Sequence, residues 1–264
     1  MHQFVPYFED FAVGDDLSDV PAVTITSGQV AIHQAIFGDR LKMALDHPLS
    51  TAVTGHHQAL VSSSLVCNIA IGLSTIPSQR VMGNLFYRGL VLREPVFVGD
   101  TLSVTTKVVG LRQNKRRAGR AASGMVALEI QVKNQHGSTV MHFWRCPMIP
   151  CRDGAIDTGK VDDFGFMPEE IEASELLAVV PDWNYEKYRA MTSGAYFSDL
   201  VVGATTNIEA KDTVTLAPEL VRMTLNMAMT HTDAGQSVYG KRLVYGGHTI
   251  AMAAAQLLRV MPNM

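Results

Sequence analysis

One short pattern occurs twice in this chain, and the duplication constrains the fold more than any other feature. Residues 7–14 and 196–203 both read Tyr-Phe-x-Asp-hydrophobic-x-Val-Gly. A sequence that repeats itself predicts a structure built from repeated units. Because 264 residues suffice for two modest domains, we expect two copies of one structural module.

Each copy continues with the same order of predicted elements. A β-branched run, residues 23–26 in the first copy and 213–215 in the second, predicts a strand before a short helix. After a polar turn comes an apolar stretch of helical length, residues 59–74 and 247–260. Helices that are apolar on all sides must be buried, and we expect sheet to wrap each of them.

Strand-like runs follow the central helix only in the first copy. Turn signals separate four such runs, residues 84–91, 101–109, 121–133 and 140–146. A long helix cradled by an antiparallel sheet is the hot-dog architecture, so the sequence predicts the α+β class and a double hot dog. The second copy reaches Met264 directly after its helix, and we therefore expect the sequence to be part of a longer protein.

The predicted domain boundaries follow from the repeat. Residues 1–151 are expected to form an N-terminal hot-dog module, and residues 196–264 a C-terminal module that is truncated after its central helix. Residues 152–195 match neither copy and are rich in Asp, Glu, Gly and Pro. This segment predicts a connector that carries one short helix.

Composition excludes several classes of protein. Apolar residues make up 47% of the chain and charged residues 18%, which is typical of a packed globular protein. The formal net charge of -3 gives no basic field for nucleic acid. The sequence has no uninterrupted apolar run of about 18 residues, so no membrane span is predicted. Its acidic start lacks the features of a secretory signal. Three cysteines without C-x-x-C spacing argue against disulfides and zinc, so we expect a soluble cytoplasmic protein.

A polar turn before each central helix carries the residues that suit chemistry. Residues 38–46 read Gly-Asp-Arg-Leu-Lys-Met-Ala-Leu-Asp, and residues 225–233 read Leu-Asn-Met-Ala-Met-Thr-His-Thr-Asp. Adding 187 to a position in the first turn gives its counterpart in the second. The polar positions then correspond as Asp39 with Asn226, Ala44 with His231, and Asp46 with Asp233. One shift that aligns three positions is hard to obtain by chance.

This turn resembles the G-D-x-N-P-x-H-x-D motif of the MaoC-like and (R)-specific enoyl-CoA hydratases. In that family the first Asp and the His five residues later form the acid–base pair. The first copy has Asp39 but Ala44 at the histidine position. The second copy has His231 but Asn226 at the aspartate position. Each copy therefore lacks a different half of the pair.

The second copy is most similar to the mesaconyl-CoA (2-methylfumaryl-CoA) hydratase branch of this family. The similarity rests on the Asn-x4-His-x-Asp of residues 226–233 and on the Leu-Val-Tyr-Gly-Gly-His of residues 243–248. The chain departs from that branch at Met227 and Ala228, where a Gly-His pair is usual, and at Gly246, where a His is usual. These departures leave the substrate open.

The resemblance implies a hydro-lyase that hydrates an α,β-unsaturated acyl-CoA thioester or catalyses the reverse dehydration, with no cofactor besides the CoA of the substrate. Such a reaction needs a base for water, an acid for the α carbon and donors for the thioester oxygen. Neutral His231 is the predicted base, Asn226 the residue that orients water, and Asp39 a third catalytic group from the first module. Gly246 and Gly247 are predicted to bind the thioester oxygen, because the start of a helix exposes unpaired N–H groups.

Each motif residue also has a simpler structural interpretation. Alone, His231 would be explained as a partly buried, hydrogen-bonded histidine, but the aligned motif favours catalysis, with Asp233 in support. Asp39 and Asp46 are explained by helix capping or by a polar turn, which we favour for both carboxylates. His47 offers a replacement for the imidazole that the first copy lacks, although its register differs.

Basic residues and histidines outside the motif also have alternative roles. Residues 112–120 lie between two predicted strands and form either a solvated hairpin tip or a clamp on CoA phosphates through Arg116, Arg117 and Arg120. The paired histidines at 56–57 have no carboxylate or Cys at ligand spacing. No metal site is therefore predicted.

Two other functions stay open. A hot-dog thioesterase usually carries its catalytic carboxylate on or near the central helix, and the two central-helix stretches contain no Asp or Glu. A non-catalytic acyl-CoA-binding or partner subunit is the stronger alternative, because neither motif copy is complete. A homodimer also stays open, although two modules in one chain already form the pair that single hot dogs obtain by dimerising.

Overall fold

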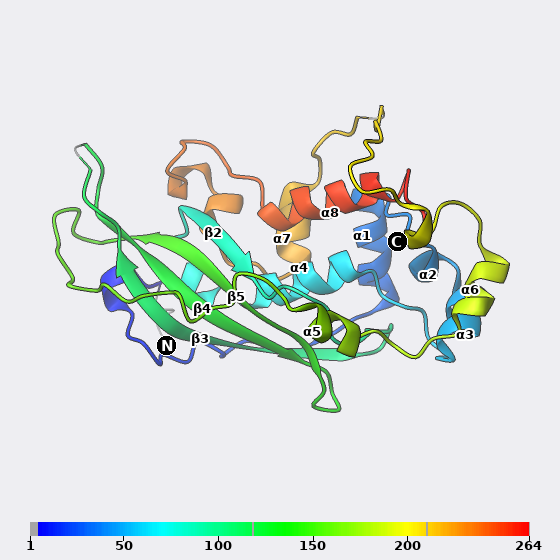
Figure 1. Ribbon diagram of the computed structural model, residues 1–264. Coiled ribbons are helices and arrows are strands. Elements are labelled where there is room, and N and C mark those ends of the chain that lie inside the picture. The colour runs from blue at the N-terminus through cyan, green and yellow to red at the C-terminus, as the bar shows by residue number, and fades with distance from the viewer. Residues whose placement is uncertain (1–4, 118, 210, 264) are drawn as a thin grey trace.

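The computed structural model describes residues 5–117, 119–209 and 211–263 (Figure 1). Its largest element is an antiparallel sheet with the strand order β1-β3-β4-β5-β2. The strands are β1 (Val23–Thr24), β2 (Gly83–Arg88), β3 (Thr101–Gln113), β4 (Ser123–Lys133) and β5 (Thr139–Pro150). The strand-like runs predicted for the first copy are confirmed as β2 to β5, with some ends shifted.

The long strands follow the alternation that their sequences encode. In β3, every second residue from Leu102 to Val108 is buried, as expected for a strand with one face on the core. The turn between β4 and β5 is closed by Asn134, whose side-chain oxygen accepts two backbone N–H groups at 3.0 and 3.1 Å. Gly137 in this turn has a φ of 83°, a conformation that favours glycine. Local sequence therefore sets this hairpin.

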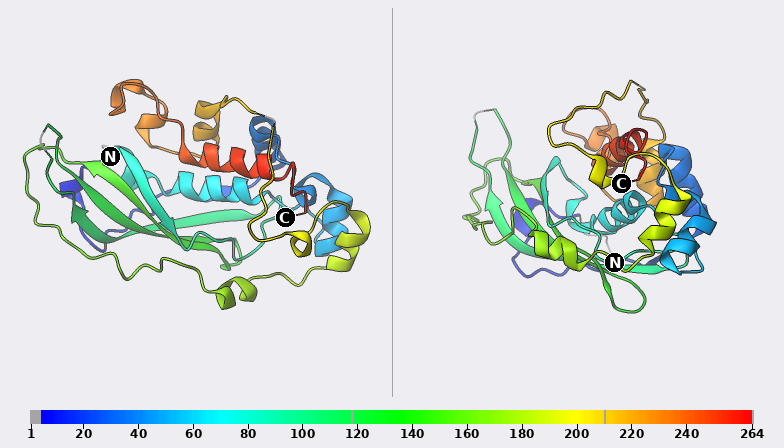
Figure 2. Two further views of the ribbon diagram at one scale, coloured as in Figure 1. Left: turned by 45° about the horizontal axis from the view of Figure 1, so that its top comes forward. Right: turned by 45° about the vertical axis from the view of Figure 1, so that its right-hand side comes forward.

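The curled sheet wraps the central helix α4 (Ser63–Leu73), as Figures 1 and 2 show. Its apolar side chains, such as Leu65 and Ile69, are almost completely buried. At the end of α4, the buried guanidinium of Arg145 donates to the hydroxyl and carbonyl oxygens of Ser74. A cation at the C-terminus of a helix interacts favourably with the helix dipole. The buried central helix predicted for the first copy is confirmed.

The second central helix, α8 (Gly246–Leu257), packs against α4 and runs in the opposite direction (Figure 2). Two glycines allow the second copy to approach α4 closely. A Cβ atom on Gly72 would overlap the carbonyl oxygen of Thr224, and one on Gly247 would overlap the side-chain oxygen of Asn68. The two halves of the chain therefore meet at positions where no methyl group fits.

The remainder of the second copy corrects two predictions. Residues 213–215 form no strand, because the described residues contain no second sheet with which they could pair. The helix α8 is covered on one side only, and Ile250 on it is 47% exposed. The other elements of this copy are short helices: η3 (Phe197–Asp199), α7 (Ala217–Met223), η4 (Met229–His231) and η5 (Ala234–Gln236).

The connector carries two short helices where one was predicted. These are α5 (Ala173–Ala178) and α6 (Tyr185–Met191). Before α5, Phe164 and Met167 pack on the face of the sheet opposite α4. After it, α6 packs on α3 (His47–Thr54) of the first copy. The connector is therefore held against the first copy along much of its length (Figure 1).

The repeated Tyr-Phe-x-Asp pattern forms the same hydrogen-bonded turn in both copies. Asp10 accepts the backbone N–H of Tyr7 at 2.9 Å, and Asp199 accepts that of Tyr196 at 2.9 Å. In each copy a short 3₁₀ helix follows. The duplication seen in the sequence is therefore also present in local hydrogen bonding.

The helix α1 (Ser27–Phe37) links the first copy to the second. α1 begins with a capping box between Thr26 and Gln29. The rings of His33 and Phe37 on this helix lie 4.7 Å apart, and Phe37 lies 5.0 Å from His248 of α8. The first copy is completed by η1 (Phe8–Asp10), α1 (Ser27–Phe37), α2 (Lys42–Leu45) and η2 (Ile76–Ser78). Within the described ranges, no helix is long and apolar enough to cross a membrane.

Replacing Gly72 with Ala is expected to destabilise the protein, because the added methyl group would overlap the backbone of Thr224. Overpacking of this kind costs about 1–3 kcal/mol. Chemical denaturation followed by circular dichroism measures the free energy of unfolding. Gly28→Ala is the matched control, since a Cβ atom there makes only an ordinary contact. Equal losses in the two variants would contradict the packing argument.

Acid is expected to weaken the fold through His33. Burial lowers the pKa of this imidazole from 6.5 to about 4, although the Asp39 carboxylate opposes the shift. Between those values the unfolded chain binds the proton more readily, so stability present above pH 6.5 is lost as the pH falls toward 4, by about 3 kcal/mol. Denaturation curves at both ends of this range measure the loss. If His33→Phe loses as much stability as wild type, another group is responsible.

Candidate active site

The two motif turns fold alike, as their register predicts. The side-chain oxygen of Asp39 accepts the N–H of Leu41 at 3.0 Å, and that of Asn226 accepts the N–H of Ala228 at 2.9 Å. Both side chains are buried. A carboxylate and an amide each provide the acceptor that closes such a turn. The difference between Asp and Asn therefore changes the chemistry of the turn but keeps its geometry.

The trailing aspartates of the two motifs act as helix caps. Asp46 accepts the N–H of Leu49 near the start of α3 at 2.9 Å. Asp233 accepts the N–H of Gly235 in η5 at 2.8 Å. Such caps satisfy backbone donors that a helix leaves unpaired. The structure thus places Asp46 in the capping role that we favoured for it, and Asp233 has the same role.

His231 ends η4, is half-buried, and has a fixed orientation. Its Nδ1 lies 2.8 Å from the carbonyl oxygen of Leu243. Because a carbonyl only accepts, Nδ1 carries the proton of the neutral ring and Nε2 keeps its lone pair. Burial lowers the pKa of His231, and the hydrogen bond to Leu243 opposes this shift. The residue is therefore a neutral imidazole with one nitrogen able to accept a proton.

The start of α8 adjoins this imidazole. The ring of Tyr245, which precedes α8, lies 5.5 Å from the ring of His231. Gly246 is exposed, with open space where a side chain would be. Gly247 is buried, and its missing side chain makes room for Asn68 of α4, so the predicted close approach at this glycine is to the protein itself. The first N–H groups of α8 have no acceptor within the helix.

Two buried polar residues near this point were not predicted from the sequence. The hydroxyl of Tyr245 and the side-chain amide of Asn68 have no hydrogen-bond partner among the described residues. Burial raises the pKa of Tyr245 well above its ordinary value of 10. An amide within an otherwise apolar helix was the available signal for Asn68. Tyr245 gave no comparable signal, because tyrosines commonly pack in cores.

Asp39 lies in a different part of the fold from His231. Its second carboxylate oxygen accepts the hydroxyl of Ser62, just before α4, at 2.5 Å. Asp39 and His47 line one cavity of about 390 Å³. Asp39 therefore lies near the start of α4. The motif turn of His231 lies near the end of α4, where the N–H of Met227 donates to the hydroxyl of Thr75 at 2.8 Å. The structure therefore brings Asp39 together with His47, and not with His231.

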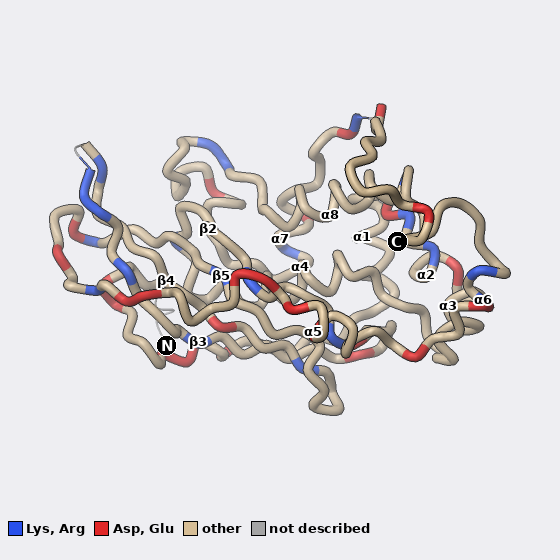
Figure 3. Tube along the Cα trace, viewed as in Figure 1, with Lys and Arg blue, Asp and Glu red and all other residues tan. Residues whose placement is uncertain are grey.

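The basic segment forms the tip of the β3–β4 hairpin, a position that both of its interpretations allow. Arg116, Arg117 and Arg120 are exposed there and line neither of the cavities described in this section. Residue 118 lies outside the described residues. Figure 3 shows the positive charges at this tip, at the upper left of the view.

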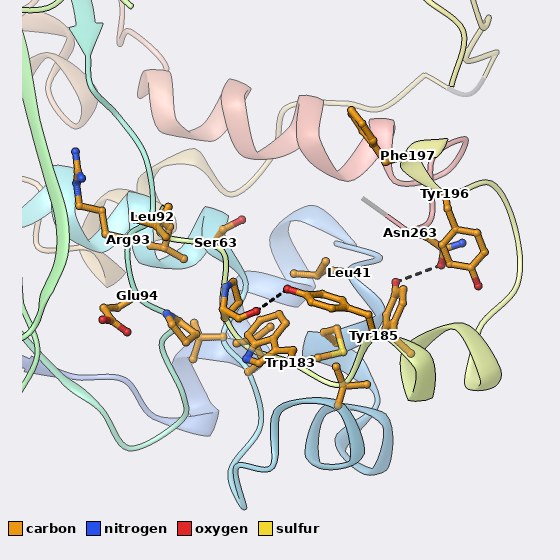
Figure 4. A pocket seen from close by; sticks show the side chains of 18 of the residues that line it. Leu41, Ser63, Leu92, Arg93, Glu94, Trp183, Tyr185, Tyr196, Phe197 and Asn263 are labelled. Atoms are coloured by element: carbon orange, nitrogen blue, oxygen red, sulfur yellow. Dashed lines mark hydrogen bonds between the residues drawn. The ribbon is translucent and has the colours of Figure 1, made fainter. Parts of the chain in front are cut away.

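A larger cavity of about 500 Å³ lies between the first copy, the connector and three residues of the second copy, Tyr196, Phe197 and Asn263 (Figure 4). Aromatic side chains of the connector form one wall, and Tyr185 there donates to the carbonyl of Pro181 at 2.7 Å. Leu41 lines this cavity and also the one beside Asp39. None of the predicted catalytic residues lines it. Sequence patterns could not reveal it, because its walls come from segments far apart in the chain.

The paired histidines have a packing role. The ring of His56 stacks on Phe97 at 3.9 Å and on His57 at 4.7 Å. Across the described ranges, no three His, Cys, Asp or Glu side chains are grouped so that they could hold a metal ion.

Comparison with known proteins finds sequence relatives with related names. No family model matches the chain. The chain is 31% identical to the beta-methylmalyl-CoA dehydratase of Chloroflexus aurantiacus over 261 residues, 94% of this chain and 70% of that protein. It is 29% identical to the mesaconyl-CoA hydratase of Cereibacter sphaeroides, over 94% of this chain and 71% of that protein. Both names describe addition of water to a CoA compound or its removal.

Solved structures share the architecture of the chain. A Mycobacterium tuberculosis protein with a double hotdog fold is 40% identical, with a TM-score of 0.86 over 98% of this chain and 78% of that one. A MaoC domain protein dehydratase from Chloroflexus aurantiacus is 28% identical, with a TM-score of 0.84 over 96% of this chain and 72% of that one. The predicted α+β double hot-dog class is confirmed. The chain belongs to the MaoC-like family of hydratases and dehydratases with a double hot-dog fold.

Proposed function

We propose that this chain adds water to an α,β-unsaturated acyl-CoA thioester, or removes it in the reverse direction, with His231 as the base. The observation that carries this proposal is the contact between Nδ1 of His231 and the carbonyl oxygen of Leu243 at 2.8 Å. It fixes the tautomer in which Nε2 accepts a proton. The two hydratase and dehydratase relatives support the reaction class.

In the hydration direction, Nε2 of His231 takes a proton from water while the water oxygen bonds to the β carbon. The electron pair of the double bond moves toward the thioester carbonyl, whose oxygen becomes negative. Backbone N–H groups of Gly246 and Gly247 stabilise this charge, since they lie at the positive end of α8. The α carbon then takes up a proton as the enolate collapses, and the imidazolium of His231 supplies it.

Asn226 is proposed to orient the attacking water. Its side-chain oxygen is held by the N–H of Ala228, so the amide N–H₂ remains a donor. Asn226 and His231 are five residues apart in one motif, and the short helix η4 lies between Asn226 and the end of the motif. An amide cannot replace the acid that a carboxyl group would provide, so His231 must carry the proton transfers. Asp39 takes no part in these steps, because it lies at the far end of the helix pair.

The substrate that we propose is a short unsaturated acyl-CoA. The relatives named for mesaconyl-CoA and beta-methylmalyl-CoA suggest an acyl group with a second carboxylate. We propose that the phosphates of CoA bind to Arg116, Arg117 and Arg120. One guanidinium group can donate two parallel hydrogen bonds to the oxygens of a phosphate. Besides the side chains and backbone groups named above, the proposed reaction uses only the acyl-CoA substrate and water, and no cofactor.

One observation favours a second candidate function. The residue aligned with the catalytic Asp is Asn226, and its oxygen is already engaged in the turn. Such a site could bind an acyl-CoA without converting it. A non-catalytic binding subunit would leave the ultraviolet absorbance of the conjugated thioester unchanged.

Replacing His231 with Ala is expected to lower kcat/KM for the hydration of crotonyl-CoA or mesaconyl-CoA by about 100-fold, the usual contribution of a general base. Loss of the absorbance of the conjugated thioester measures the rate. His136→Ala is the matched control, since His136 is exposed in the β4–β5 turn. A His231→Ala variant as active as wild type would remove His231 from the site. Release of free CoA by the wild type would instead indicate a thioesterase.

The pH dependence of hydration is expected to report His231. Burial lowers the pKa of His231 below the ordinary value of 6.5. The neutral base is therefore present at neutral pH, and kcat/KM falls only as the pH drops through this lowered value. A pH–rate profile on crotonyl-CoA measures the fall, and circular dichroism at each pH separates it from unfolding. A midpoint above 6.5 contradicts the assignment.

A further inference from the structure

The cavity beside Asp39 has the size and lining of a ligand site. Its volume is about 390 Å³, within the range of small-molecule pockets. Residues from α1, the motif turn and the start of α4 line it, and Ala44 occupies the wall where the family motif has histidine. Apolar walls are contributed by Val30, Leu65 and Val98. A few polar groups thus converge on a largely apolar space.

Three polar side chains that line this cavity, His33, Asp39 and Ser62, are buried, and not all of their polar atoms are used by the fold. His33 is 2% exposed, and its Nε2 has no hydrogen-bond partner among the described residues. Burying a polar atom without a partner is costly. Ser62, which precedes α4, is fixed by its hydrogen bond to Asp39. The N–H groups of the first turn of α4 lie beside it and have no acceptor within the helix.

The internal repeat indicates what this cavity binds. Asp39 and Asn226 close equivalent turns, and each turn stands before the start of a central helix. In the second copy, this arrangement is the proposed thioester site beside His231. The first copy repeats the turn, the helix start and a buried imidazole, although His33 comes from a different position. Equivalent backbone geometry therefore presents equivalent donors to a ligand.

We infer that the first copy contains a second acyl-thioester site, which binds the thioester end of an acyl-CoA in the cavity lined by His33, Asp39 and Ser62. The choice of ligand rests on the proposed function. The donors for the thioester oxygen are His33 and the first N–H groups of α4. The apolar walls accept the acyl chain.

This second site binds without catalysing hydration. Ala44 supplies no imidazole at the motif position, and His47, which also lines the cavity, is exposed at the start of α3. Both carboxylate oxygens of Asp39 are already hydrogen-bonded, one to Leu41 and one to Ser62. Burial lowers the pKa of His33 to about 4, so this ring is a weak base and acts as a neutral hydrogen-bonding group.

The number of bound ligands tests the inference. Butyryl-CoA is the probe, because its acyl chain has no double bond and cannot be hydrated. Isothermal titration calorimetry on the wild-type chain is expected to give two molecules bound per chain. Ala44→Phe fills the cavity and is expected to reduce this number to one while crotonyl-CoA hydration stays unchanged. The matched control is Ala190→Phe on the exposed side of α6, which is expected to keep two.

A second variant protects the test against misfolding of Ala44→Phe. His33→Phe removes one donor and is expected to weaken one of the two binding events about tenfold, with hydration at His231 unaffected. One molecule bound in wild type, whether or not Ala44→Phe removes it, overturns the inference. Two molecules bound in both wild type and Ala44→Phe also overturn it. Failure of the proposed function gives a different result, because the wild type would then not hydrate crotonyl-CoA or mesaconyl-CoA.

Discussion

The contact between α4 and α8 is the constraint on which the rest of the structure depends. The sheet of the first copy buries α4, and α4 in turn covers the buried side of α8. Gly247 makes this contact tight, since a Cβ atom there would meet Asn68 of α4, and Gly72 of α4 likewise lies against Thr224 of the second copy. Because the helices run in opposite directions, the start of each lies near the end of the other. The two motif turns are therefore held at opposite ends of one packed unit.

Duplication explains why the motif turns differ in chemistry but agree in geometry. Each turn needs one buried side-chain acceptor two residues before the N–H that it binds, and Asp39 and Asn226 both meet this need. The turn therefore tolerates the exchange of a carboxylate for an amide. The exchange does change the proton chemistry, because an amide cannot give up or take up a proton at neutral pH as a carboxyl group can. Each copy could lose a different half of the acid–base pair while its fold was kept.

The sequence predicted what depends on local pattern and missed what depends on distant partners. The strands β2 to β5 and the two apolar central helices are marked by the local sequence, and all were predicted. Residues 213–215 have strand-like composition but no neighbouring strand, so composition alone misled. Gly247 was singled out for its backbone N–H, and the sequence did not indicate that its Cα also lies against the side chain of Asn68. His33 was not considered at all, since it lies outside the motif and reaches the cavity only through the packing of α1.

Burial alone does not explain which histidine can act as a base. Burial lowers the pKa of His33, His231 and His248, so all three rings are neutral at neutral pH. Both ring nitrogens of His248 lack partners among the described residues, and it packs on Phe37. His231 differs because the carbonyl of Leu243 holds its Nδ1–H and opposes the drop in its pKa. The same hydrogen bond thus fixes the tautomer and keeps the ring more basic. The segment between His231 and Leu243 is therefore part of the catalytic unit, although its sequence carries no catalytic side chain.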